Sequence, residues 1–236
     1  MELSVVLVKP LYEGNVGSAA RVMKNFGVRD LVLIKPCKLE KEASDMAVHA
    51  KEILKRAKKY SSFEAAIRGF DLVVGTTAES TDKDDYFTRI AISPEELRKK
   101  LEKVNGKMAL VFGPEDSGLP NEELERCDMV VTIPTSKNYR SMNLSHAVAI
   151  ILYELTKATS YKRQATSPRL SGKKEKDLIV ENFRAIVNFI KYPKPKERRK
   201  IFNVMLTRIM GRAQVTGREA NTLIGVLKKI KKRLER

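Results

Sequence analysis

The stretch TIPTSKNYRSMNLSHAVAIILYEL, residues 132–155, joins a polar loop to one of the most apolar helices that the sequence predicts. Its second half repeats apolar residues at helical spacing: Leu144, Ala147, Val148, Ile151, Leu152 and Leu155. Its first half contains the polar loop 138–143, which ends where that helix begins. The positive end of a helix dipole and the free N–H groups there attract ligands. We therefore predict a binding site at the start of this helix.

Upstream of this stretch, apolar runs alternate with helical patterns. Strands are predicted at 3–8, 30–36, 71–77, 107–113 and 128–134. Helices are predicted at 15–27, 45–60, 62–70, 93–104, 121–127 and 144–158. Because the strands are continuous apolar runs, helices are expected on both faces of a mostly parallel sheet. The pattern predicts an α/β fold whose ligands bind beyond the carboxyl ends of the strands.

The composition is that of a globular protein. Of the 236 residues, 42% are apolar and 32% are charged, and no apolar run is as long as a membrane span. The N-terminal sequence lacks the basic region and the cleavage site of a secretion signal. Cys37 and Cys127 have no metal-binding spacing. We expect a cytoplasmic protein with no disulfide and no membrane association.

Positive charge is concentrated in the last third of the chain. Residues 1–159 contain 24 Lys and Arg against 23 Asp and Glu, whereas residues 160–236 contain 22 against 6. A solvated charged face is one explanation of this imbalance. A folded module that is this basic favours a polyanionic partner instead.

The sequence divides into three parts. A polar and basic segment that contains Pro168 and Gly172 is interpreted as a linker. Three helical stretches follow it, roughly at 175–191, 196–211 and 217–235. We predict an α/β domain at 1–158, a linker at 159–174 and a basic helical extension at 175–236.

Common catalytic signatures are missing from the sequence. It has no G-x-G-x-x-G after a strand, no Walker loop and no Cys/His metal cluster. Its two histidines, His49 and His146, lie within predicted helices and are interpreted as helix-surface or core residues. No metal is expected to take part in the chemistry.

Two further stretches carry unusual patterns. NVGSAARVMKNFG (15–27) has a face of small residues that a ligand or another backbone can approach closely, with Asn15 as a candidate helix cap. The alternative explanation is close packing of that helix, with Arg21 as a surface charge. LVFGPEDSGLPNEEL (110–124) ends a strand in a tight acidic turn between Gly113 and Gly118. The alternative there is a simple connection into a helix capped by Asn121.

Together the three stretches resemble the SpoU/TrmH branch of the SPOUT RNA methyltransferases. That family has an Asn…Arg helix, a Gly-Glu…Gly-(Leu/Ile) loop after a strand and an Ile-Pro…Ser-(Leu/Met)-Asn loop before an apolar helix. The resemblance covers residues 1–158. It implies a trefoil-knotted fold, S-adenosylmethionine as the methyl donor, and a homodimer in which the helix at 144–158 is buried.

The resemblance also implies the site residues. Those that would bind S-adenosylmethionine are Thr76, Thr77, Ala78, Gly113, Gly118, Ile133, Arg140, Ser141 and Met142. Those that would serve catalysis are Arg21, Glu115, Asn15, Ser141 and Asn143. A guanidinium stays protonated, so Arg21 is expected to hold the phosphate beside the target ribose, with Glu115 orienting it. Arg140 stands where other members often have a small residue, and an RNA contact is expected there.

The implied reaction is methyl transfer to a ribose 2′-OH of tRNA. The form Tyr-x-Ser-Met-Asn-Leu and the basic extension narrow the resemblance to members that modify tRNA. That resemblance implies anticodon-loop nucleotide 32 as the target, as cytidine, with uridine as a second base. A ribosomal RNA 2′-O-methyltransferase is the nearest alternative. An RNA-binding protein that kept the fold without catalysis is another, although the intact Arg21, Ser141 and Asn143 favour an enzyme.

Overall fold

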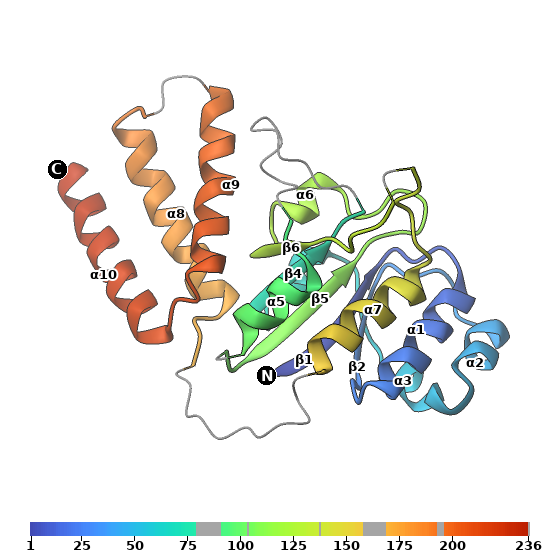
Figure 1. Cartoon of the computed structure of the whole chain (residues 1–236). Helices are drawn as coiled ribbons and strands as arrows, with labels where there is room; N and C mark the ends of the chain where they lie inside the picture. Colours follow the sequence, from blue (N-terminus) through green and yellow to red (C-terminus); the bar gives the residue numbers. More distant parts are fainter. Residues whose placement is uncertain (79–90, 103, 137, 158–168, 193–195, 236) are drawn as a thin grey trace.

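Six parallel strands form one sheet within the residues that this computed structural model describes: 1–78, 91–102, 104–136, 138–157, 169–192 and 196–235 (Figure 1). The strands are β1 (Glu2–Val8), β2 (Asp30–Ile34), β3 (Lys58–Tyr60), β4 (Leu72–Thr76), β5 (Lys107–Phe112) and β6 (Met129–Val131). They lie in the order β3-β2-β1-β5-β4-β6, and every neighbouring pair is parallel. The predicted α/β fold is confirmed, and the trefoil knot stays a prediction.

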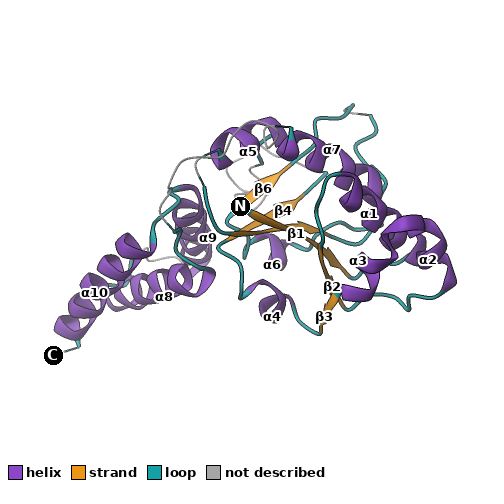
Figure 2. Cartoon of the chain, turned by 90° about the horizontal axis from the view of Figure 1, so that it is seen from below, coloured by secondary structure: helices purple, strands orange, loops and turns teal. Residues whose placement is uncertain are grey.

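Helices cover both faces of the sheet (Figure 2). One face carries α1 (Glu13–Asn25), α2 (Lys41–Ala47), α3 (Lys51–Arg56), α5 (Pro94–Leu101) and α7 (Leu144–Thr156), and the other carries α4 (Phe63–Ile67) and α6 (Asn121–Leu124). Successive strand residues point to opposite faces. Val5 and Leu7 of β1 therefore join the apolar cluster under the first set, and Val6 and Val8 join the cluster under the second.

The predicted single helix at 45–60 is wrong. The chain forms α2, a one-turn 3₁₀ helix (Val48–Ala50) and α3, and then the edge strand β3. Val48 has φ 50°, which ends α2, and Lys58 pairs with Val32 of β2. Pairing along the sheet edge has outweighed the helical pattern of the local sequence.

The first helix begins earlier than predicted. Tyr12 is its N-cap and makes no side-chain capping bond, so the prediction that Asn15 caps α1 is wrong. Gly27 closes the helix with φ 72°, as predicted. The small-residue face lies against α2, because a Cβ on Gly17 would stand 2.2 Å from the carbonyl oxygen of Ala43. Close helix packing therefore explains this face.

Three long helices follow the α/β unit: α8 (Lys173–Phe189), α9 (Lys196–Arg212) and α10 (Gly217–Leu234), and we call them the basic bundle (Figure 1). They share an apolar cluster that includes Ile179, Met210 and Leu227. Residues 159–168 of the predicted linker lie outside the described residues. The residues that follow them form bridges to the neighbouring units, Arg169 with Asn105 and Leu170 with Thr216, and the last two of the predicted linker, Lys173 and Lys174, belong to α8. None of the described helices combines the length and apolar character needed to cross a membrane.

Candidate active site

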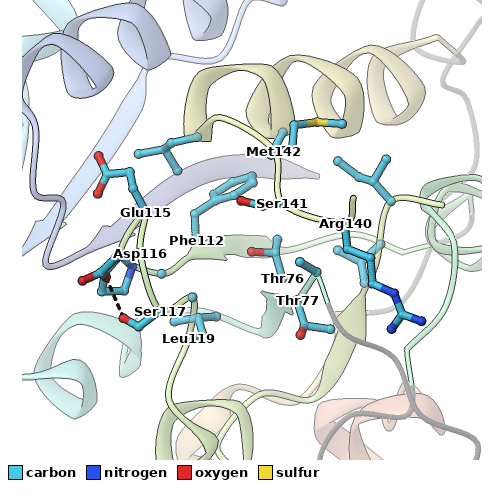
Figure 3. A pocket seen from close by; sticks show the side chains of 18 of the residues that line it. Thr76, Thr77, Phe112, Glu115, Asp116, Ser117, Leu119, Arg140, Ser141 and Met142 are labelled. Carbon is cyan, nitrogen blue, oxygen red and sulfur yellow. Dashed lines mark hydrogen bonds between the residues drawn. The ribbon is translucent and has the colours of Figure 1, made fainter. Parts of the chain in front are cut away.

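A cavity of about 480 Å³ lies beyond the carboxyl ends of β4, β5 and β6 (Figure 3). Three loops and the first turns of α7 enclose it. Its walls are formed by Thr76, Thr77, Ala78, Phe112, Gly113, Pro114, Glu115, Asp116, Ser117, Gly118, Leu119, Val131, Ile133, Thr135, Arg140, Ser141, Met142, Leu144, Ala147 and Ile151. This is where a parallel sheet places its ligands.

The predicted ligand contacts converge on this cavity. All nine residues assigned to the methyl donor line it, and so does Glu115. In Figure 3 the Ser141 side chain lies between Phe112 and Met142, whereas the Arg140 guanidinium points away from Phe112. Arg140 is an exposed residue at the rim, in keeping with the expected RNA contact.

Sequence reasoning missed part of the wall. Phe112 and Leu119 flank the acidic turn, and Leu144, Ala147 and Ile151 face the cavity from α7. These residues look like ordinary core positions in a strand or helix. Their proximity to the predicted loop residues in the sequence was the available signal.

The acidic turn is folded back on itself. Gly118 has φ 66°, and its N–H donates to the carbonyl of Pro114 at 2.9 Å. A Cβ on Gly113 would stand 2.2 Å from the carbonyl carbon of Gly118, so only glycine fits there. The turn therefore brings the backbone of Gly113 and Gly118 close together at the cavity wall.

Glu115 ties this turn to the start of α1. Its Oε2 accepts the N–H of Leu11 at 2.8 Å, and its Oε1 accepts the Asn15 Nδ2–H at 2.9 Å. The expectation that Glu115 orients Arg21 is not met, since within the described residues no hydrogen bond joins the two. Asn15 and Arg21 are six residues apart, or about 9 Å along the helix axis.

Asn143 continues the connection from Asn15 to α7. Its Nδ2 donates to the Asn15 Oδ1 at 2.9 Å, and its Oδ1 accepts the Ser145 N–H at 2.9 Å as the N-cap of α7. Glu115, Asn15 and Asn143 thus join the turn after β5 to the starts of both α1 and α7. We call these three residues the polar network.

Arg21 lies apart from the cavity. It is an exposed residue on α1 and is not part of the cavity wall. A guanidinium placed there can bind a phosphate from solvent.

We expect Glu115→Gln to lower the free energy of unfolding by about 1–2 kcal/mol, because hydrogen bonds to a charged group contribute about that much and one of the two is lost. Whichever way the amide is turned, its NH₂ group faces either the Leu11 N–H or the Asn15 amide. Urea unfolding of the variant measures the loss.

The matched control for this prediction is Asp116→Asn, one residue further along. It makes the same change of charge, but Asp116 is exposed and accepts the Ser117 hydroxyl at 2.8 Å. Equal losses in the two variants would contradict a specific role of the polar network.

Comparisons with known proteins agree with this geometry. The profile of the SpoU rRNA Methylase family matches residues 2–153. The tRNA (cytidine-2′-O-)-methyltransferase TrmJ of Methanocaldococcus jannaschii is 42% identical over 96% of this chain and 98% of that protein. The tRNA (cytidine/uridine/adenosine-2′-O-)-methyltransferase TrmJ of Pseudomonas aeruginosa is 32% identical over 98% of this chain and 94% of that protein.

A solved structure adds to this similarity. The crystal structure of TrmJ from Z. mobilis ZM4 has a TM-score of 0.78 at 23% identity, over 97% of this chain and 98% of that one, which bears on the fold. The family matches cover the three motif stretches and the sheet that places them around one cavity. The chain belongs to the SpoU methylase family.

Proposed function

We propose that this protein transfers a methyl group from S-adenosylmethionine to a ribose 2′-OH of tRNA. The observation that carries the proposal is the convergence of all nine predicted donor contacts on one cavity at the carboxyl ends of β4, β5 and β6. The full-length similarity to proteins with that named activity supports it.

The cavity suits the methyl donor in size and chemistry. About 480 Å³ lies within the range of small-molecule sites, which are mostly apolar with a few polar groups. Ile133, Met142 and Ala147 offer apolar surface to a nucleobase, and the turn between Gly113 and Gly118 brings backbone close. The start of α7 favours a carboxylate. When bound there, the donor supplies an activated methyl group.

The acceptor side depends on residues outside the cavity wall. Arg21 would bind the phosphate next to the target ribose in a two-pronged contact, and so hold the 2′-OH in line for attack. The polar network would keep the loop 138–143, which contains Ser141, in position. Asn143 is the last residue of this loop and also the N-cap of α7. The proton of the hydroxyl could pass to that phosphate or to water.

We further propose a cytoplasmic homodimer that modifies nucleotide 32. Four exposed apolar residues lie on or beside α1 and α7: Leu11 and Tyr12 just before α1, and Ile150 and Tyr153 on α7. The two helices pack together, with the Phe26 and Tyr153 rings 6.4 Å apart. A second copy placed on this face would cover it.

The relatives named above differ in the bases they accept. For this chain we propose cytidine as the preferred base and uridine as the second.

The test is methylation of tRNA transcripts by the purified protein, with the methyl groups mapped by resistance of the backbone to alkaline cleavage. We expect modification at nucleotide 32, and none when that ribose is 2′-deoxy. Ribosomal RNA is offered in parallel. Methylation of ribosomal RNA alone would replace the proposed substrate, and donor binding without transfer to either RNA would favour the non-catalytic alternative.

We expect the basic bundle to supply much of the tRNA affinity. Changing four exposed residues of α10 to Gln, namely Lys228, Lys229, Lys232 and Arg233, should weaken binding. It should also lower the slope of log K against log salt by up to about 3, because each phosphate contact contributes roughly 0.7 to 0.9. Filter binding between low and moderate salt measures both effects.

A control variant removes the same number and kind of charges from the α/β unit. It changes the exposed residues Lys55, Arg56, Lys58 and Lys59 to Gln. If tRNA affinity and the slope of log K against log salt fall equally in both variants, the protein binds tRNA through its total charge and not through the bundle.

A further inference from the structure

Buried charges gather where the basic bundle meets the α/β unit. Within the described parts of the chain the buried charged residues are Asp128, Lys173, Lys176 and Arg208, with exposed fractions of 1%, 5%, 2% and 8%. Asp128 directly precedes β6, whereas the three cations belong to α8 and α9. A charge is rarely buried unless it is paired. The interface between the basic bundle and the α/β unit therefore contains buried charges of both signs.

Asp128 is bonded to the sheet on one side and faces the bundle on the other. Its Oδ2 accepts the N–H of Val73 at 2.9 Å and lies 3.6 Å from Lys176 Nζ. Its Oδ1 lies 3.9 Å from Lys173 Nζ. Both lysines come from the first turn of α8.

The cations also hold backbone carbonyls of the α/β unit. Lys173 donates to Arg126, Lys176 to Asp71 and Arg208 to Leu124, at 2.9, 2.6 and 3.0 Å. The backbone of α9 touches Asp128 as well, because a Cβ on Gly211 would stand 2.5 Å from the Asp128 Cβ. Two bundle helices are thus fixed to the same few residues.

Asp128 supplies the buried negative charge of this interface. Burial raises the pKa of the neighbouring Cys127 thiol to about 12, so that thiol stays neutral. Asp177 lies 3.4 Å from Lys173, but its side chain is half exposed. Removing the Asp128 charge would leave buried cations without their main partner, which is more damaging than lacking the pair altogether.

The bundle is attached at the end of the strands that is opposite the cavity. Asp71 and Asp128 precede β4 and β6, whereas Thr76 and Val131, which line the cavity, stand at the carboxyl ends of these strands. The five residues of β4 span about 17 Å. The point where the bundle is attached and the cavity are therefore separated by about the length of β4.

We propose that Asp128 fixes the basic bundle as a rigid arm, so that RNA bound to the arm meets the cavity at a set distance. Asp128 is then a positioning residue, and the preferred substrate is a structured RNA that extends well beyond the methylated loop. A fixed arm raises the effective concentration of the target ribose at the cavity. A loosely attached arm lowers that concentration. This inference rests on the proposed function and deepens it.

The test compares full-length tRNA with an isolated anticodon stem-loop as substrates. Asp128→Asn keeps an oxygen for the Val73 N–H and removes the charge. We expect kcat/KM on tRNA to fall about tenfold, mainly through KM, with little change on the stem-loop or in donor affinity. Gly211→Ala, which changes a residue of α9 that contacts Asp128, should lower kcat/KM on tRNA in the same way. X-ray scattering should show a larger radius of gyration for both variants.

Two further variants separate this role from general damage. In the Asp128→Asn background, Lys176→Met removes an unpaired cation and should restore part of kcat/KM on tRNA. Gly225→Ala on α10 adds a Cβ that meets nothing within 4 Å, and should leave activity unchanged.

The outcomes distinguish this inference from the proposed function. Normal kcat/KM of Asp128→Asn on tRNA, equal losses on both RNAs, or no recovery with Lys176→Met would each overturn the role of Asp128 while leaving the proposed function intact. If the wild-type protein methylates neither RNA, the proposed function fails and this inference fails with it.

Discussion

Arg21→Ala should lower the single-turnover rate of tRNA methylation by about 100- to 1,000-fold, the range seen when one donor to the transition state is removed. Affinity for S-adenosylmethionine should stay within about twofold, because Arg21 is not part of the cavity wall. An interaction made mainly in the transition state lowers kcat and kcat/KM together. The measurement is methylation at saturating donor, beside a separate calorimetric titration of the donor.

Arg21→Lys should recover little of this rate. A lysine keeps the positive charge, but a point charge cannot reproduce the planar two-pronged contact of a guanidinium with a phosphate. The distinction matters because tRNA affinity in general depends on charge, which both residues carry. A full rescue by lysine would reduce Arg21 to one of many nonspecific phosphate contacts.

The control is Arg29→Ala. Arg29 is also exposed and lies just before β2, beyond the end of α1. Its loss should change the rate by less than about threefold, as for a surface charge that contributes only to the general field. Near-normal turnover in Arg21→Ala would remove that residue from the mechanism and leave it as an ordinary surface charge.

Most strands and helices could be predicted from the sequence because the patterns that mark them are local. Continuous apolar runs marked five of the six strands in the described sheet, and the helix predicted at 93–104 is present as α5. The edge strand β3 was missed because Lys58, Lys59 and Tyr60 have no strand pattern of their own. Their conformation comes from pairing with β2, which is a contact between distant parts of the chain.

The site was predicted less completely than the fold. Motif residues such as Gly113 and Ser141 could be found because each loop carries a pattern within a few residues. The polar network could not, since its hydrogen bonds join residues that are 100 and 128 positions apart. Asn15 illustrates the difference, because its position suggested a helix cap while its amide binds Glu115 and Asn143. Asp128 likewise looks like any charged residue before a strand until α8 is placed against it.

Ser141→Leu should weaken S-adenosylmethionine binding by about 10- to 100-fold, the equivalent of the 1–3 kcal/mol that a bulky group costs in a packed site. Ser141 lines the cavity between Phe112 and Met142 (Figure 3), so the larger side chain would occupy ligand space. Calorimetric titration of the donor measures the effect. Thermal unfolding should change little, because Ser141 is exposed in the absence of ligand.

The matched control is Ser136→Leu in the same loop. Ser136 is exposed and is not part of the cavity wall, so the same substitution there should leave donor affinity within about twofold. Equal losses in the two variants would mean that the loop is sensitive to any apolar residue. Unchanged affinity in Ser141→Leu would place the donor outside this cavity.

Mixing the Arg21→Ala and Ser141→Leu proteins, at a donor concentration too low to occupy the Ser141→Leu cavity, shows which protomer's Arg21 serves a given cavity of the proposed homodimer. Arg21 lies outside the wall of its own cavity, so we expect it to act in the cavity of the partner within a dimer. A heterodimer of Arg21→Ala and Ser141→Leu protomers then keeps one complete site, formed by the intact cavity of the first and the arginine of the second. After random exchange of protomers, about a quarter of wild-type activity should return, because half of the dimers are mixed and each has one working site of two. If each protomer used its own Arg21, no combination would contain an intact site, and the mixture would stay as inactive as its components.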